Sequence, residues 1–204
     1  FGIETFGASS IALLVPYLLE YVLPMKAYMV PLLITYVIPQ FAFTPVFIWL
    51  SRKYGKKRLW CTTMWASAFM FILTFFVVTP GEFSYLIWPG TFIFGLCGGC
   101  AAVTAPSIKA DIIDFDEYTT GERKEGAYLA VWNLIRKGAG SLTALFTGLA
   151  LQFSGFMPNI EQSEQVQYWI LGLFSLLPGI CYLIGAIIFM GFSFNEKEHA
   201  AVRD

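Results

Sequence analysis

The sequence predicts an all-α integral membrane protein with six transmembrane helices. Apolar residues make up 57% of its 204 residues and charged residues only 13%, whereas soluble proteins average roughly 25% charged. Six apolar stretches each reach the length of about 20 residues that a membrane-spanning helix needs. They lack the period-2 alternation of membrane barrel strands. The lipid bilayer is therefore an expected partner, and the net charge of −1 argues against nucleic acid.

Short polar or Pro/Gly-bearing breaks separate the expected spans. The spans cover residues 3–23, 28–50, 59–79, 85–108, 125–153 and 166–193. Their internal prolines are tolerable in a membrane, where neighbouring helices satisfy the freed carbonyl groups. Glu4 and Glu20 lie near opposite ends of the first span and are expected at the membrane interface. Because the chain begins with Phe1 directly at an apolar stretch, we expect a fragment whose upstream part is missing.

The basic residues of the connecting segments predict the orientation of the chain. They lie between the second and third spans, before the fifth span and in the tail: Arg52, Lys53, Lys56, Lys57, Arg58, Lys109, Arg123, Lys124, Lys197 and Arg203. All of them fall on one side of the membrane if the six spans are real. The opposite connections contain one basic residue, Lys26. This asymmetry predicts a multi-pass protein of the cell membrane with both termini of the segment in the cytoplasm.

The fifth span carries charge near its middle. If its helix begins near Lys124, Lys137 lies about 20 Å along the axis at roughly 1.5 Å per residue. A charge at the bilayer centre costs at least about 2.5–3.5 kcal/mol, so it should face a polar cavity or a partner. Asn133, Lys137 and Ser141 share one helix face, and we predict that they line a substrate cavity. The alternative is that Lys137 reaches the membrane surface or closes a structural ion pair. Arg136 points about 100° away and is assigned to structure or gating.

An acidic segment precedes the fifth span on the predicted cytoplasmic side. Asp111 and Asp114 are one helical turn apart and can pair with the basic loop 52–58, which contains Arg52 and Arg58. Ion pairs of this kind can latch a gate that a rearrangement opens. The alternative is a solvated loop, because a surface ion pair contributes only about 0–1 kcal/mol.

The remaining chemistry-bearing residues argue against catalysis. The Cys-Gly-Gly-Cys run at 97–100 lies inside the fourth span, and Gly95 and Gly99 are four residues apart, so close helix packing explains it better than a redox pair. His199, the only histidine, lies in the polar tail, which excludes a His-based metal site within the membrane. The sequence has no phosphate loop and no nucleophile elbow. We therefore predict that the protein is not an enzyme and holds no cofactor.

The segment from Ala110 onward resembles a known family. The stretches Ala-Asp-Ile-Ile-Asp-Phe-Asp-Glu, Glu-Arg-Lys-Glu-Gly-Ala-Tyr and Arg-Lys-Gly-Ala-Gly-Ser, with Leu-x-x-Ser-Gly-Phe at 151–156, are similar to the glycoside–pentoside–hexuronide:cation symporters. This is the melibiose permease branch of the major facilitator superfamily, and the resemblance covers all six spans. It implies one half of a twelve-helix bundle, the carboxy-terminal half, with the amino-terminal half missing.

The resemblance also implies a function. Members couple uptake of a sugar or related small solute to Na⁺, Li⁺ or H⁺ by alternating access, and the coupling cation is expected mainly in the missing half. Lys137 matches the family's lysine near the cavity, and Arg123 and Glu125 join Asp111 and Asp114 in its charged cytoplasmic gate. A bacterial inner membrane is the implied location. Two alternatives remain open, namely transport of a lipid and a non-transporting membrane module that acts as a structural partner or solute sensor.

Overall fold

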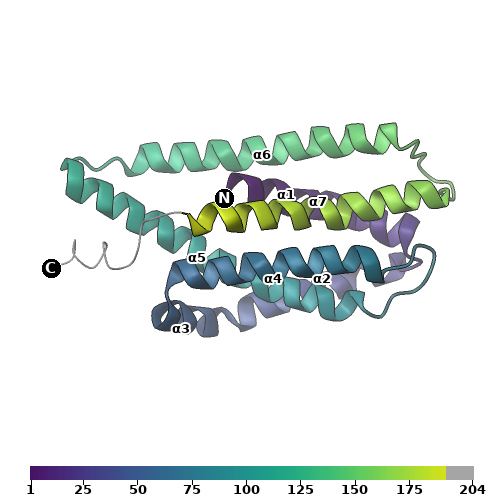
Figure 1. The fold of residues 1–204 in the computed structure, drawn as a ribbon, viewed down its shortest axis with the longest axis horizontal. Coiled ribbons are helices and arrows are strands. Elements are labelled where there is room, and N and C mark those ends of the chain that lie inside the picture. The colour runs from purple at the N-terminus through teal and green to yellow at the C-terminus, as the bar shows by residue number, and fades with distance from the viewer. Residues whose placement is uncertain (192–204) are drawn as a thin grey trace.

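The computed structural model describes residues 1–191, and its regular elements are all helices. In order they are α1 (Gly2–Tyr17), η1 (Leu18–Val22), η2 (Lys26–Tyr28), α2 (Met29–Ala42), α3 (Thr44–Tyr54), α4 (Lys56–Val77), α5 (Ile87–Thr120), α6 (Glu125–Phe153) and α7 (Glu164–Met190) (Figure 1). The predicted all-α class is confirmed for these residues. Lys197, His199 and Arg203 lie outside them.

Four helical segments are long and apolar enough to cross a membrane, namely Gly2–Val22, Lys56–Val77, Ile87–Thr120 and Glu164–Met190. A fifth span results if α2 and α3 count as one bent helix. The α6 helix has 29 residues but is not among these segments. Its mean hydropathy is lowered by Arg136 and Lys137 and by its Gly, Ser and Thr residues. The structure therefore supports a multi-pass membrane protein, and the count of six spans remains a prediction.

The predicted second span, residues 28–50, is divided by a bend of 50° between α2 and α3. Pro45 lies in the first turn of α3 and has no backbone N–H, so it cannot continue the hydrogen-bond ladder of α2. Thr44 partly compensates, since its hydroxyl donates to the Gln40 carbonyl oxygen at 2.7 Å. The bend brings α3 into contact with α5 and α4.

The α5 helix continues beyond the predicted end of the fourth span at residue 108, as far as Thr120. No residue between these positions interrupts the helix until Gly121, which adopts the left-handed conformation with φ of 70°. Such a glycine is a common helix end. The acidic segment with Asp111 and Asp114 therefore lies on a helical extension of α5.

The helices pack in an open arc. In turn α6 contacts α1, α1 contacts α7, α7 contacts α4, α4 contacts α5, and α5 contacts α2. In Figure 1, α6 runs along one side of the bundle and α2 and α4 lie on the other. Fully buried side chains such as Leu14, Met64 and Leu171 fill the core shared by α1, α4 and α7. This arrangement leaves α1 and α5 facing each other across the inner side of the arc.

Two glycines allow α2 to approach α5 closely. A Cβ atom on Gly99 would lie 2.8 Å from the Gln40 Cα atom, and one on Gly95 would overlap the Tyr36 carbonyl oxygen. Cys97 and Cys100 are buried free thiols. The packing interpretation of the run at 97–100 is thus confirmed.

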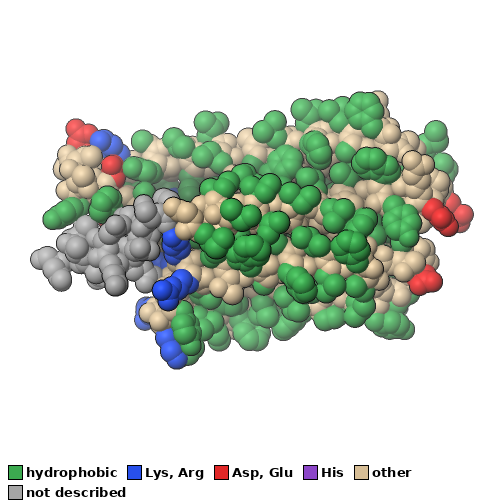
Figure 2. All heavy atoms as spheres, viewed as in Figure 1, with side chains coloured by type: hydrophobic (Ala, Val, Ile, Leu, Met, Phe, Trp, Pro, Cys, Tyr) green, Lys and Arg blue, Asp and Glu red, His purple; other side chains and the backbone are tan. Residues whose placement is uncertain are grey.

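Charge is concentrated at the ends of the bundle. Figure 2 shows hydrophobic side chains over the middle of one face, with Lys and Arg gathered at one end. Large apolar residues remain exposed along the helices, with Phe41 75% and Phe76 76% exposed. A soluble monomer rarely exposes continuous apolar surface of this extent, whereas lipid tails cover it in a membrane.

Candidate functional site

A cavity of about 940 Å³ opens between α1 and α5. The α2 and α6 helices contribute its flanks, and residues of α4 and α7 contribute to its floor. Its lining is mostly apolar with a few polar groups, which is typical of sites for small molecules. The bundle therefore has a cavity of small-molecule size on the inner side of the arc.

Aromatic rings form two walls of this cavity. Phe1 and Trp132 stack with their ring centroids 3.8 Å apart, which joins α1 to α6. Tyr36 of α2 and Phe94 of α5 stack at 5.5 Å. Flat aromatic faces pack well against the C–H surface of a ring-shaped solute, because both surfaces are apolar and planar.

Two cationic side chains reach the same cavity. Lys109 of α5 places its Nζ atom 5.2 Å from the Trp132 ring centroid, a distance suited to a cation–π contact. Arg136 of α6 lines the cavity and forms no ion pair with any described residue. The cavity can therefore hold hydroxyl groups or an anionic group of a solute.

A buried carboxyl group also belongs to the lining of this cavity. Glu4 of α1 is only 9% exposed, and its Oε1 atom accepts a hydrogen bond from Trp60 Nε1 of α4 at 3.1 Å. Its Oε2 atom is buried and has no hydrogen-bond partner among residues 1–191. Glu4 is thus buried inside the bundle, although its expected place at the membrane interface stays a prediction. Glu20, by contrast, is exposed and pairs with Lys26 at 2.5 Å.

The predicted cavity residues lie on another face of α6. Lys137, Asn133 and Ser141 are all exposed, and none of them lines the cavity between α1 and α5. Arg136, which was assigned to gating, is the α6 cation that lines it. The solute-binding role of the Lys137 face thus remains a prediction about a surface on the outside of this bundle.

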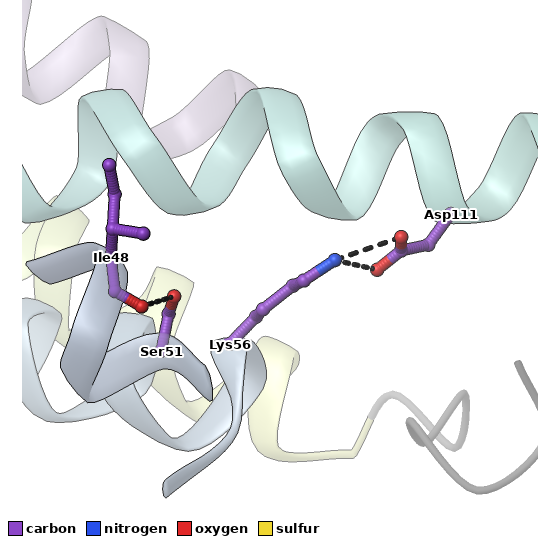
Figure 3. Close-up of polar contacts among 4 residues, drawn as sticks. All are labelled: Ile48, Ser51, Lys56 and Asp111. Atoms are coloured by element: carbon purple, nitrogen blue, oxygen red, sulfur yellow. Dashed lines mark hydrogen bonds and ion pairs between the residues drawn. The ribbon is translucent and has the colours of Figure 1, made fainter. Parts of the chain in front are cut away.

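The predicted contact between the acidic segment and the basic loop is present in one specific pair. Lys56 Nζ lies 2.9 Å from Asp111 Oδ1 and 2.6 Å from Oδ2 (Figure 3). The two side chains are 27% and 15% exposed. Gly55, with φ of 92°, provides the turn that starts α4 at Lys56 and directs this lysine to α5. The sequence predicted that the basic loop takes part in the gate but did not single out Lys56. The direction of the Lys56 side chain depends on the turn at Gly55, which the charge pattern does not reveal.

The other predicted gate residues lie apart from this pair. Arg123 pairs with Glu125 at 3.1 Å in the exposed connection between α5 and α6. That hydrogen bond raises the pKa of Arg123, with help from nearby carboxylates. Arg52 and Arg58 are exposed and form no ion pair with any other described residue. Asp114 is exposed near the end of α5.

Three relatives indicate what kind of protein shares this sequence. "Uncharacterized symporter YjmB" of Bacillus subtilis is 34% identical over 98 residues, which cover 47% of this chain and 21% of that protein. "Putative sulfoquinovose importer" of Escherichia coli is 28% identical over 151 residues, or 73% of this chain and 32% of that protein. "Putative 2,3-dihydroxypropane-1-sulfonate exporter" of Escherichia coli is 25% identical over 155 residues, which cover 74% of this chain and 32% of that protein.

The chain thus matches at most about a third of the length of these three relatives. A family model described as MFS/sugar transport protein matches residues 1–196, nearly the whole chain. Its helices, its apolar surface and its central cavity agree with that match. The chain belongs to the MFS/sugar transport protein family, a family of membrane transporters and not of enzymes.

Proposed function

We propose that the protein is a secondary active transporter that moves a sugar or related small solute by cation-coupled symport and alternating access. The observation that carries this proposal is the cavity between α1 and α5, which combines aromatic walls with two cations. Family membership supports transport of sugar-like solutes, and the names of relatives that contain "symporter" support cation coupling. The coupling cation, Na⁺, Li⁺ or H⁺, is proposed to bind mainly in the other half of the carrier.

The cavity favours a solute that carries an anionic group. Lys109 and Arg136 are the two cations in its lining, and Glu4 is its one acidic residue. A guanidinium binds a carboxylate or sulfonate through two parallel hydrogen bonds, which are stronger than bonds between neutral groups. Two of the relatives carry names for sulfonated solutes. A sugar or polyol with a sulfonate or carboxylate is therefore the proposed substrate class.

The Lys56–Asp111 pair is the proposed latch of the cytoplasmic gate. It joins the start of α4 to the extended end of α5, at the end of the bundle that carries the basic residues. Ion pairs that are partly shielded from water can be broken and re-formed during rearrangement. Closure at this end would seal the cavity from the cytoplasm in one conformation of the carrier.

Uptake by proteoliposomes tests the proposed function. The complete protein that carries this chain is expected to accumulate labelled sulfoquinovose above the outside concentration when a Na⁺ or H⁺ gradient is imposed, and an ionophore should abolish the accumulation. Labelled glucose, which has no anionic group, should accumulate less. Solute binding without any flux would instead identify a sensor. Flux of a labelled lipid without flux of either sugar would identify a lipid carrier. Either of these results would contradict the proposal.

A further inference from the structure

Glu4 of α1 is a buried carboxyl group in the lining of the cavity. Only Oε1 has a partner, the Trp60 indole N–H, and the buried Oε2 atom has none among the described residues. An ionised carboxylate with an unpaired oxygen away from water is costly. A carboxyl group that has taken up a proton on Oε2 carries no charge and avoids most of this cost.

A proton fits this site better than a metal cation does. A hard cation such as Na⁺ takes several oxygen ligands, as Ca²⁺ and Mg²⁺ do, whereas a proton needs only one oxygen atom. Within residues 1–191 no group of three or more His, Cys, Asp or Glu side chains could hold a metal ion. The group of Trp60 that contacts Glu4 is the indole N–H, a hydrogen-bond donor. An indole N–H cannot be a metal ligand.

We propose that Glu4 is a proton-binding site of the carrier, neutral while the cavity is dry and ionised when water enters it. The proposal rests on the proposed cation-coupled transport and adds a proton site in this half to the cation site proposed for the other half. The titratable and charged side chains of the surrounding helices that share the cavity or flank α1 are Tyr36, Lys109, Arg136, Cys181 and Tyr182. Burial opposes ionisation of Glu4 and the hydrogen bond from Trp60 to Oε1 favours it, so a change in hydration can shift the balance.

This site also couples the proton to the solute. Protonation of Glu4 removes the one negative charge of the cavity lining and leaves the positive charges of Lys109 and Arg136. An anionic solute then binds more tightly, and by thermodynamic linkage the bound solute strengthens proton binding by the same factor. The pair would therefore enter together, which is the requirement for symport.

Infrared spectroscopy of the complete protein tests the proposal directly. As pH rises, the wild type is expected to lose a carboxylic acid C=O band, and Glu4→Gln is expected to lack that band at every pH. Trp60→Phe removes the donor to Oε1 and should shift the pH at which the band disappears. Glu20→Gln, an exposed carboxyl near the other end of the same helical segment, is the matched control and should leave the band unchanged. If the titrating bands of wild type and Glu4→Gln are identical, Glu4 is not a proton site.

Transport assays separate this proposal from the proposed function. Glu4→Gln is expected to lose accumulation driven by a pH gradient, whereas Glu20→Gln, which lies outside the cavity, should keep it. Full pH-driven accumulation by Glu4→Gln would overturn the proposal. If the wild type has the titrating Glu4 band but moves no sugar in any assay, the proposed solute transport fails and the proton site stands.

Discussion

Asp111→Asn is expected to abolish accumulation of solute while leaving solute binding nearly unchanged. The substitution removes the charge that Lys56 contacts across α4 and α5. A partly buried, charge-assisted hydrogen bond contributes about 1–3 kcal/mol, which corresponds to a factor of roughly 5–150 in the equilibrium of the gate. A gate that no longer closes lets accumulated solute leak back. Accumulation and exchange in proteoliposomes, measured side by side, separate this defect from a loss of binding.

Two further variants make this result specific to the latch. The exchanged pair Lys56→Asp with Asp111→Lys restores the opposite charges and should recover part of the accumulation. Glu122→Gln breaks the exposed pair with Lys124 and should have little effect, because exposed pairs contribute about 0–1 kcal/mol. The Lys56–Asp111 pair is not the latch of the gate if Asp111→Asn accumulates solute as the wild type does.

Gly99→Ala is expected to lower the thermal stability of the protein in detergent by the equivalent of about 1–3 kcal/mol. The added methyl group would meet the backbone of Gln40 at 2.8 Å, and backbone atoms cannot move aside as a flexible side chain can. The α2 helix would have to shift away from α5, which would also widen the cavity.

Gly126→Ala is the matched control for this substitution. No atom lies within 4 Å of the position where its methyl group would be added. The change should be neutral or slightly stabilising, since alanine favours a helix over glycine by up to about 1 kcal/mol. Equal melting temperatures for Gly99→Ala and Gly126→Ala would show that α2 and α5 do not pack as closely as the structure indicates.

Local features of the sequence predicted the class of the fold and much of its packing. Apolar composition and span length predict membrane helices because a lipid environment imposes both. The spacing of Gly95 and Gly99 predicted close packing because both glycines lie on one helix face. The bend at Pro45 was missed because prolines are common in membrane helices and only some of them divide a span.

The candidate site was predictable only in part. The acidic segment and the basic loop were correctly paired because opposite charges on one side of the membrane have few other partners. The Lys56 contact depends on the turn at Gly55, which the charge pattern does not reveal. The burial of Glu4 depends on Trp60, 56 positions along the chain, and a position near a span end suggests exposure instead. Long-range contacts of this kind decide which of the neighbours Arg136 and Lys137 lines the cavity.

Solute binding in the cavity between α1 and α5 is tested most directly by equilibrium binding to Arg136 variants. Binding of sulfoquinovose to the complete protein is expected to weaken at least about tenfold in Arg136→Gln, because a charge-assisted hydrogen bond contributes about 1.5–3 kcal/mol. Arg136→Lys should retain part of the affinity, and Lys53→Gln, a cation outside the cavity, should retain all of it. Unchanged affinity in Arg136→Gln, with Lys53→Gln also unchanged, would contradict the assignment of this cavity as the solute site.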